Sequence, residues 1–260
     1  MEFNEEYNII LITLDGLRKD KIELSSSLKS IIKESIYFSN MITVSPYTLA
    51  SLHAIFSGMY PSRNGVDAYY SMFKFKKDEI VTLPEILQTK GYYTCCDIIS
   101  DVIIPKKGFN ERNIFDESNI DFKKRHSELI QKLSEKKFFL YLHYTEIHKH
   151  LVMDVIQKHK EENDDTYFNS IKENDLRYSS YLPYLDSYVS TIMETLRNSK
   201  ILDKTIVILH ADHGTIIGEK KGEKFYGFLG RFLRVINIFR EILGDFYKFY
   251  CIKIWLGFFM

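Results

Sequence analysis

Three short apolar segments of this 260-residue chain each end in polar side chains of the kinds that bind metals or take part in catalysis. The segments are residues 8–14, 138–143 and 205–210. Each is almost continuously apolar and too short for a core helix, which is typical of a strand buried on both faces of a parallel sheet. The chain is therefore expected to build a sheet whose buried strands deliver polar residues at their ends.

Helical patterns fill most of the chain between these strands. Apolar residues recur every three or four positions in the segments 27–36, 48–59, 82–90, 116–137 and 185–196. Further strands are expected at residues 36–41 and 92–99, and the charged stretch 154–175 is expected to be an exposed excursion. Strands that alternate with helices predict an α/β fold, with a mostly parallel central sheet covered by helices on both faces.

The polar residues that follow the three strands are expected to meet. Asp15 follows the first strand, the group 146–150 follows the second, and Asp212 and His213 follow the third. In open parallel sheets, ligands bind outside the carboxyl ends of the strands. Asp15, Asp212 and His213 would together suit a divalent cation, and their donor atoms favour zinc or manganese over calcium or magnesium.

Thr48 stands at the start of the expected helix 48–59, just after Pro46. Unpaired backbone N–H groups and the helix dipole favour an anion at that position. Taken alone, Thr48 has two interpretations, a helix N-cap or a hydroxyl that attacks a bound oxyanion. Beside a cation held by the strand-end residues, the Thr48 hydroxyl would also contact the metal and become a nucleophile near neutral pH.

Segments 8–20, 46–62 and 206–214 together resemble the sulfatase-like branch of the alkaline phosphatase superfamily, and the likeness extends over residues 8–227. The resemblance implies the sulfatase N-terminal-domain fold and a divalent metal ion. It makes Asp15, Asp212 and His213 metal ligands and Thr48 the nucleophile that is transiently esterified. His148 matches a histidine that faces the substrate in this family.

The sequence departs from the sulfate-cleaving members at three places. Those members carry Cys or Ser, oxidised to formylglycine, in a Cys-x-Pro-x-Arg pattern, whereas Thr48 cannot form the aldehyde and lacks that Pro and Arg. The acidic pair of the first strand is Asp15-Gly16, and the family's Gly-Lys segment is replaced near Ser100-Asp101. These changes favour a hydrolase or transferase that acts on a phosphate ester, less readily a sulfate ester. The substrate would be a small molecule or a group linked to a glycan or lipid.

Other polar residues leave alternatives open. Glu146 and His150 have the spacing of second-metal ligands, but a polar loop with one functional histidine is the favoured interpretation. His143 ends a strand and is expected to be a hydrogen-bonded structural histidine. His210 would be either a partner of the site or a structural residue. Asp186 would either cap a helix or act near the site.

Composition bears on the binding partners, the location and the extent of the domain. Lys and Arg balance Asp and Glu at 35 each, which gives no indication of nucleic-acid binding. The three cysteines form no CxxC pair, and the N-terminus lacks a signal-peptide pattern, so a reducing, cytoplasmic location is expected. Residues 1–227 are expected to form the catalytic domain, incomplete at its C-terminal side, and 228–260 an aromatic-rich tail.

The tail has two interpretations. Basic residues interleaved with apolar ones would let it contact a membrane or a partner as an amphipathic helix, or it would be a truncated or altered end. A second function class follows from the second interpretation: a catalytically inactive, shortened member of the family that serves as a binding or membrane-peripheral module.

Overall fold

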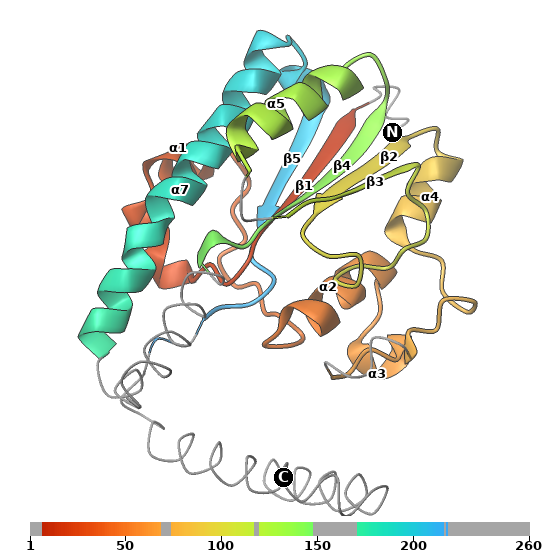
Figure 1. The fold of residues 1–260 in the computed structure, drawn as a ribbon, viewed down its shortest axis with the longest axis horizontal. Helices are drawn as coiled ribbons and strands as arrows, with labels where there is room; N and C mark the ends of the chain where they lie inside the picture. Colours follow the sequence, from red (N-terminus) through yellow and green to blue (C-terminus); the bar gives the residue numbers. More distant parts are fainter. Residues whose placement is uncertain (1–6, 69–73, 117–119, 148–170, 216, 218–260) are drawn as a thin grey trace, which may run out of the picture.

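The fold is built around a parallel sheet whose described strands run in the order β3-β2-β4-β1-β5 (Figure 1). The computed structural model describes residues 7–68, 74–116, 120–147, 171–215 and 217. Its strands are β1 (Asn8–Leu14), β2 (Tyr93–Ile98), β3 (Glu111–Ile114), β4 (Phe138–Tyr144) and β5 (Thr205–His210). The predicted α/β class with a parallel central sheet is confirmed.

Helices cover both faces of this sheet (Figure 1). The described helical elements are η1 (Lys19–Leu24), α1 (Ser26–Lys33), α2 (Thr48–Ser57), α3 (Pro61–Asn64), α4 (Leu83–Thr89), α5 (Phe122–Leu133), α7 (Ile171–Asn198) and η5 (Leu202–Lys204). None of the helices in the described ranges combines the length and apolar character needed to cross a bilayer.

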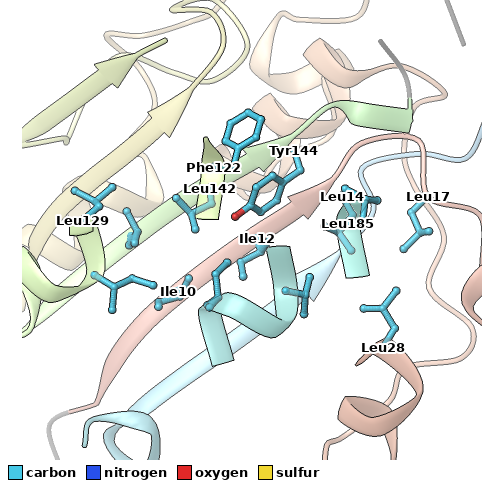
Figure 2. Close-up of a cluster of buried hydrophobic side chains, with 14 of the residues drawn as sticks. Ile10, Ile12, Leu14, Leu17, Leu28, Phe122, Leu129, Leu142, Tyr144 and Leu185 are labelled. Carbon is cyan, nitrogen blue, oxygen red and sulfur yellow. The ribbon is translucent and has the colours of Figure 1, made fainter. Parts of the chain in front are cut away.

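One face of the sheet packs against α1, α5 and α7. Because strand side chains alternate between faces, Ile10, Ile12 and Leu14 all point to this side. They are buried in one cluster with Leu129 of α5 and Leu185 of α7 (Figure 2). The amphipathic pattern that predicted a helix at 185–196 therefore marks the face that α7 buries.

The opposite face packs against α2. Leu11 of β1 and Tyr141 of β4 share a buried cluster with Leu52 and Phe56 of α2. The rings of Phe56 and Tyr141 meet edge to face, with centroids 4.9 Å apart. The same alternation directs Asp15 to this face, because its backbone N–H donates to the Tyr144 carbonyl (2.9 Å) and so extends the β1–β4 ladder by one residue. The packing of α2 thus decides which helix stands over Asp15.

A buried polar network joins α5 to the sheet and was not predicted from the sequence. Arg125 and His126 of α5 both bond the Asp97 carboxylate of β2, and the other ring nitrogen of His126 bonds the Tyr144 hydroxyl. Burial raises the pKa of Asp97, but the hydrogen bonds from Arg125 and His126 outweigh burial and hold that pKa below its ordinary value. The network steadies Tyr144, whose carbonyl is the partner of Asp15.

Several predicted boundaries were wrong. Residues 36–41 form no strand, and Ile36, Phe38 and Met41 are 83%, 68% and 78% exposed. β1 already pairs with β4 on one side and β5 on the other, so no strand position beside it was open. Residues 171–175 belong to α7 instead of an exposed excursion, and 154–170 lie outside the described residues. The short strand β3 escaped prediction because its sequence, Glu-Arg-Asn-Ile, is polar and it lies at an edge.

Candidate active site

The structure brings together the side chains of Asp15, Asp212 and His213. One potential ligand atom from each lies within 4.8 Å of the others, and all three residues are buried. Asp15 directly follows β1, and Asp212 and His213 come shortly after β5. Since these two strands are parallel neighbours in register, their carboxyl ends lie side by side. This is the convergence that the strand-end pattern predicts.

The loops around the three residues orient their ligand atoms. The backbone N–H groups of His213 and Gly16 donate to Asp212 Oδ1 at 3.0 and 3.4 Å. Gly16 adopts a φ of 73°, a conformation that glycine allows without strain. His213 Nδ1 donates to the Gly214 carbonyl at 2.9 Å, because a carbonyl can only accept. His213 Nε2 therefore keeps its lone pair in the neutral ring, and it lies 3.5 Å from Asp15 Oδ1 and 3.5 Å from Asp212 Oδ2.

The electrostatics of this group fit a divalent cation. Burial, followed by the nearby Asp15 carboxylate, raises the pKa of Asp212 above its ordinary value. Asp212 Oδ2 is buried and accepts no hydrogen bond from any residue in the described ranges. A buried carboxylate oxygen without a hydrogen bond, a second carboxylate and an imidazole lone pair together make a donor set that suits a metal ion. The residues present therefore fit the metal ion that the resemblance implies.

Thr48 lies against this group and does not cap its helix. The N-cap of α2 is Tyr47, in an extended conformation and without a side-chain cap bond, and Thr48 is the first helical residue. The Thr48 hydroxyl donates to Asp15 Oδ2 at 3.3 Å and lies 3.2 Å from His213 Nε2. The capping interpretation of Thr48 is wrong, because the tertiary fold turns this hydroxyl toward the metal-ligand group.

Two further hydroxyls, which sequence reasoning missed, anchor α2 to the loop after β5. Ser51 Oγ and Thr43 Oγ1 both donate to the Asp212 carbonyl, at 2.7 and 2.6 Å. Ser51 follows Thr48 by three residues, so both lie on one helix face. That spacing was the signal available for Ser51. No comparable signal marked Thr43, which precedes the helix in an irregular segment.

The remaining predicted residues lie apart from the ligand group or outside the description. His148 and His150 are outside the described residues. The ligand group found in the described ranges does not include Glu146, which interacts with Tyr188 and, after burial, contributes to the raised pKa of that phenol. Asp186 accepts hydrogen bonds from the Ser27 backbone N–H and from the Ser25 and Ser26 hydroxyls, at the start of α1. Because it accepts these hydrogen bonds at the start of α1, Asp186 is a helix-capping residue.

His210 lies in the sheet beneath the site and supports it. Its Nε2 bonds Thr13 Oγ1 (2.9 Å), which also bonds the Tyr141 hydroxyl (3.0 Å). Burial lowers the pKa of His210 to about 4, so its ring is neutral near pH 7.

Comparison with solved structures gives the same fold. The lipoteichoic acid synthase LtaP from Listeria monocytogenes aligns with a TM-score of 0.63 at 17% identity, over 85% of this chain and 60% of that one. The putative sulfatase YidJ from Bacteroides fragilis aligns with a TM-score of 0.60 at 16% identity, over 82% and 63%. A murine ectonucleotide pyrophosphatase/phosphodiesterase aligns with a TM-score of 0.58 at 15% identity, over 80% and 57%.

This chain therefore spans about 60% of the length of the Listeria protein. No curated protein sequence matches it. The family model described as Sulfatase matches residues 7–230, which is most of the chain. The solved structures share its fold, and on the family match the chain belongs to the sulfatase family.

Proposed function

We propose that this chain is a metal-dependent hydrolase or transferase that acts on a phosphate ester, less readily on a sulfate ester, with Thr48 as the nucleophile. The observation that carries the proposal is the position of the Thr48 hydroxyl, 3.3 Å from Asp15 Oδ2 and 3.2 Å from His213 Nε2. A nucleophile within hydrogen-bond reach of a proton acceptor is the arrangement that covalent catalysis needs.

The choice of threonine supports phosphoryl over sulfuryl chemistry. Thr48 has no route to the formylglycine of the sulfate-cleaving members, because oxidation of a threonine hydroxyl cannot give an aldehyde. Among the structural neighbours, the murine phosphodiesterase is described as inactive with a threonine replaced by alanine, in complex with AMP. AMP is a phosphate ester. The Listeria neighbour is a lipoteichoic acid synthase, which makes a lipid-linked acceptor or donor a reasonable class for this chain too.

Asp15, Asp212 and His213, with the Thr48 hydroxyl, would hold a zinc or manganese ion. Such an ion, when bound, lowers the pKa of a neighbouring hydroxyl and offsets charge on the oxygens of a phosphoryl group. The protein supplies the rest. Asp15 Oδ2 accepts the Thr48 proton in the hydrogen bond that orients the hydroxyl for attack. The backbone N–H groups and the dipole at the start of α2 would favour the anionic group that the hydroxyl attacks.

His148 completes the proposal. It lies outside the described residues, so its place facing the substrate rests on the sequence resemblance, and we propose that it protonates the leaving oxygen. A histidine suits the task because its ordinary pKa lies close to neutral pH.

A panel of chromogenic esters tests the proposed reaction. The full chain is assayed with bis-p-nitrophenyl phosphate, p-nitrophenyl phosphate and p-nitrophenyl sulfate, each with manganese, zinc or EDTA, and with glycerol as an added acceptor. We expect cleavage of a phosphate ester that needs manganese or zinc and exceeds cleavage of the sulfate. A preference for the sulfate would contradict the phosphoester assignment. No cleavage of any ester would favour the inactive binding module instead.

A further inference from the structure

His143 is a buried imidazole at the carboxyl end of β4, beside the proposed site. Its side chain is 1% exposed, and its backbone pairs in register with Thr13 of β1. Thr13 is in turn paired with His210 of β5, so the three residues form one row across neighbouring strands. In a parallel sheet, residues in one row project to the same face. His143 therefore shares the face that carries Asp15 and α2.

The hydrogen bonding of His143 differs from that of its row. Thr13 bonds both the His210 ring and the Tyr141 hydroxyl, whereas neither ring nitrogen of His143 has a hydrogen-bond partner among the described residues. The expectation that His143 is a satisfied structural histidine is wrong. Because an unpaired buried polar group costs about 1–3 kcal/mol, such a group calls for an explanation.

The orientation of the His143 ring explains why its nitrogen atoms are buried here. Tyr141 stacks on the His143 ring with centroids 6.4 Å apart and planes 16° apart, which limits its rotation. In this orientation His143 Nε2 lies 3.4 Å from Asp15 Oδ2, the same oxygen that accepts the Thr48 hydroxyl bond. A shift of a few tenths of an ångström would complete a hydrogen bond between them.

His143 meets Asp15 from outside the metal-ligand group. The ligand atoms that lie within 4.8 Å of one another come from Asp15, Asp212 and His213, and His143 is not among them. We propose that His143 is a positioning residue: its Nε2–H donates to Asp15 Oδ2 and leaves Asp15 Oδ1 directed at the cation beside His213. This inference rests on the proposed function, because it requires Asp15 to be a metal ligand.

Paired variants of His143 test this role through metal binding. His143→Gln keeps an N–H donor near the Nε2 position, whereas His143→Met fills a similar volume without one. Manganese affinity of the full chain is measured by titration calorimetry, with thermal unfolding to check that each variant folds. We expect His143→Met to weaken manganese binding about 10- to 100-fold, the usual effect of losing such an outer contact, and His143→Gln to restore most of it.

The matched control is His53→Met, which removes another buried imidazole. His53 Nδ1 bonds the Leu49 carbonyl and its ring packs on Phe75, so we expect manganese affinity to stay at the wild-type value. If His143→Met binds manganese as tightly as wild type, the positioning role is wrong while the proposed function stands. If wild type itself binds neither manganese nor zinc, the proposed function fails instead.

A measurement on the wild-type protein does not depend on a variant that folds. With ¹⁵N-labelled histidine, nuclear magnetic resonance reports which ring nitrogen of His143 carries the proton. We expect the proton on Nε2, in slow exchange with water, and expect its signal to shift when diamagnetic zinc is added to the metal-free protein and to broaden beyond detection with paramagnetic manganese. A proton found only on Nδ1 would overturn the inference, because Nε2 would then have nothing to donate to Asp15.

Discussion

Replacing Thr48 with alanine is expected to lower kcat for a phosphate ester by about 10⁴-fold or more, the scale seen when a covalent nucleophile is removed. Thr48→Ser keeps a hydroxyl at the start of α2 and should retain measurable turnover. The Thr48 hydroxyl makes no helix-capping bond, so Thr48→Ala should still fold, with an unfolding temperature lowered only by the loss of the hydrogen bond to Asp15 Oδ2. Steady-state kinetics with the best ester of the panel, together with thermal unfolding, measure both effects.

The control for this prediction is Thr191→Ala. Thr191 belongs to α7, which covers the opposite face of the sheet, and its hydroxyl donates to the Ser187 carbonyl within the same helix. Its loss should leave kcat unchanged. In wild type, rapid acid quenching during turnover should trap a phosphorylated peptide containing Thr48, found by mass spectrometry. Full activity in Thr48→Ala would show that another group attacks the ester, and the mechanism proposed here would be wrong.

Replacing Asp212 with asparagine is expected to have opposite effects with and without metal. In EDTA the substitution removes one of two buried like charges while its Oδ1 can still accept from the His213 and Gly16 N–H groups. The metal-free variant should therefore unfold at a higher temperature than wild type, by about 2–4 °C for each kcal/mol gained. With manganese, wild type gains stability through binding and the variant does not, so their order reverses.

The stability of the metal-free protein should change with pH, and the direction follows from the pKa of Asp212. The pKa of Asp212 is raised in the folded protein, so the unfolded chain loses this proton first as pH rises. Stability of the metal-free wild type should consequently fall from the ordinary carboxyl pKa up to the raised one, and the advantage of Asp212→Asn should grow across that range. Thermal unfolding from pH 4 to pH 8 in EDTA gives the comparison. A variant less stable than wild type at every pH would contradict the picture of two repelling carboxylates.

Asp186→Asn is the matched control because it removes a carboxylate whose pKa is lowered in the folded protein, whereas that of Asp212 is raised. Burial raises the pKa of Asp186, but hydrogen bonds from Ser25 and Ser27 outweigh it and hold that pKa below the ordinary value. Asp186→Asn should therefore lose stability above the ordinary carboxyl pKa. Its response to manganese should match that of wild type, since Asp186 contacts the start of α1 and is not in the metal-ligand group.

Sequence alone predicted the parts of the fold that hydrophobic periodicity controls. The runs that became β1, β4 and β5 were recognised as strands because they are short, apolar and closed by polar residues. The expected burial of β5 on both faces was wrong: it is the edge strand of the described sheet, and Ile206 and Ile208 are 46% and 43% exposed. Parallel pairing then forced the residues after β1 and β5 together. The stretch 36–41 failed for the complementary reason: its apolar residues suit a strand, but pairing partners on both sides of β1 were already taken.

The site was predicted where its residues follow strand ends and missed where it depends on packing. Thr48 illustrates both. Its place at a helix start was evident from the sequence, yet only the packing of α2 onto the sheet showed that its hydroxyl turns to Asp15 instead of capping. Likewise, His143 looked like an ordinary buried histidine, because no local pattern shows whether a ring nitrogen finds a partner across the sheet.

The central claim is that Asp15, Thr48, Asp212 and His213 hold one divalent cation. Crystals of the full chain grown with manganese, measured at the manganese absorption edge, test it most directly. We expect an anomalous peak with Asp15, Asp212 and His213 as ligands at about 2.0–2.3 Å and the Thr48 oxygen beside it. A peak bound by other residues, or none at a manganese concentration that supports ester cleavage, would show that these four residues do not form the metal site.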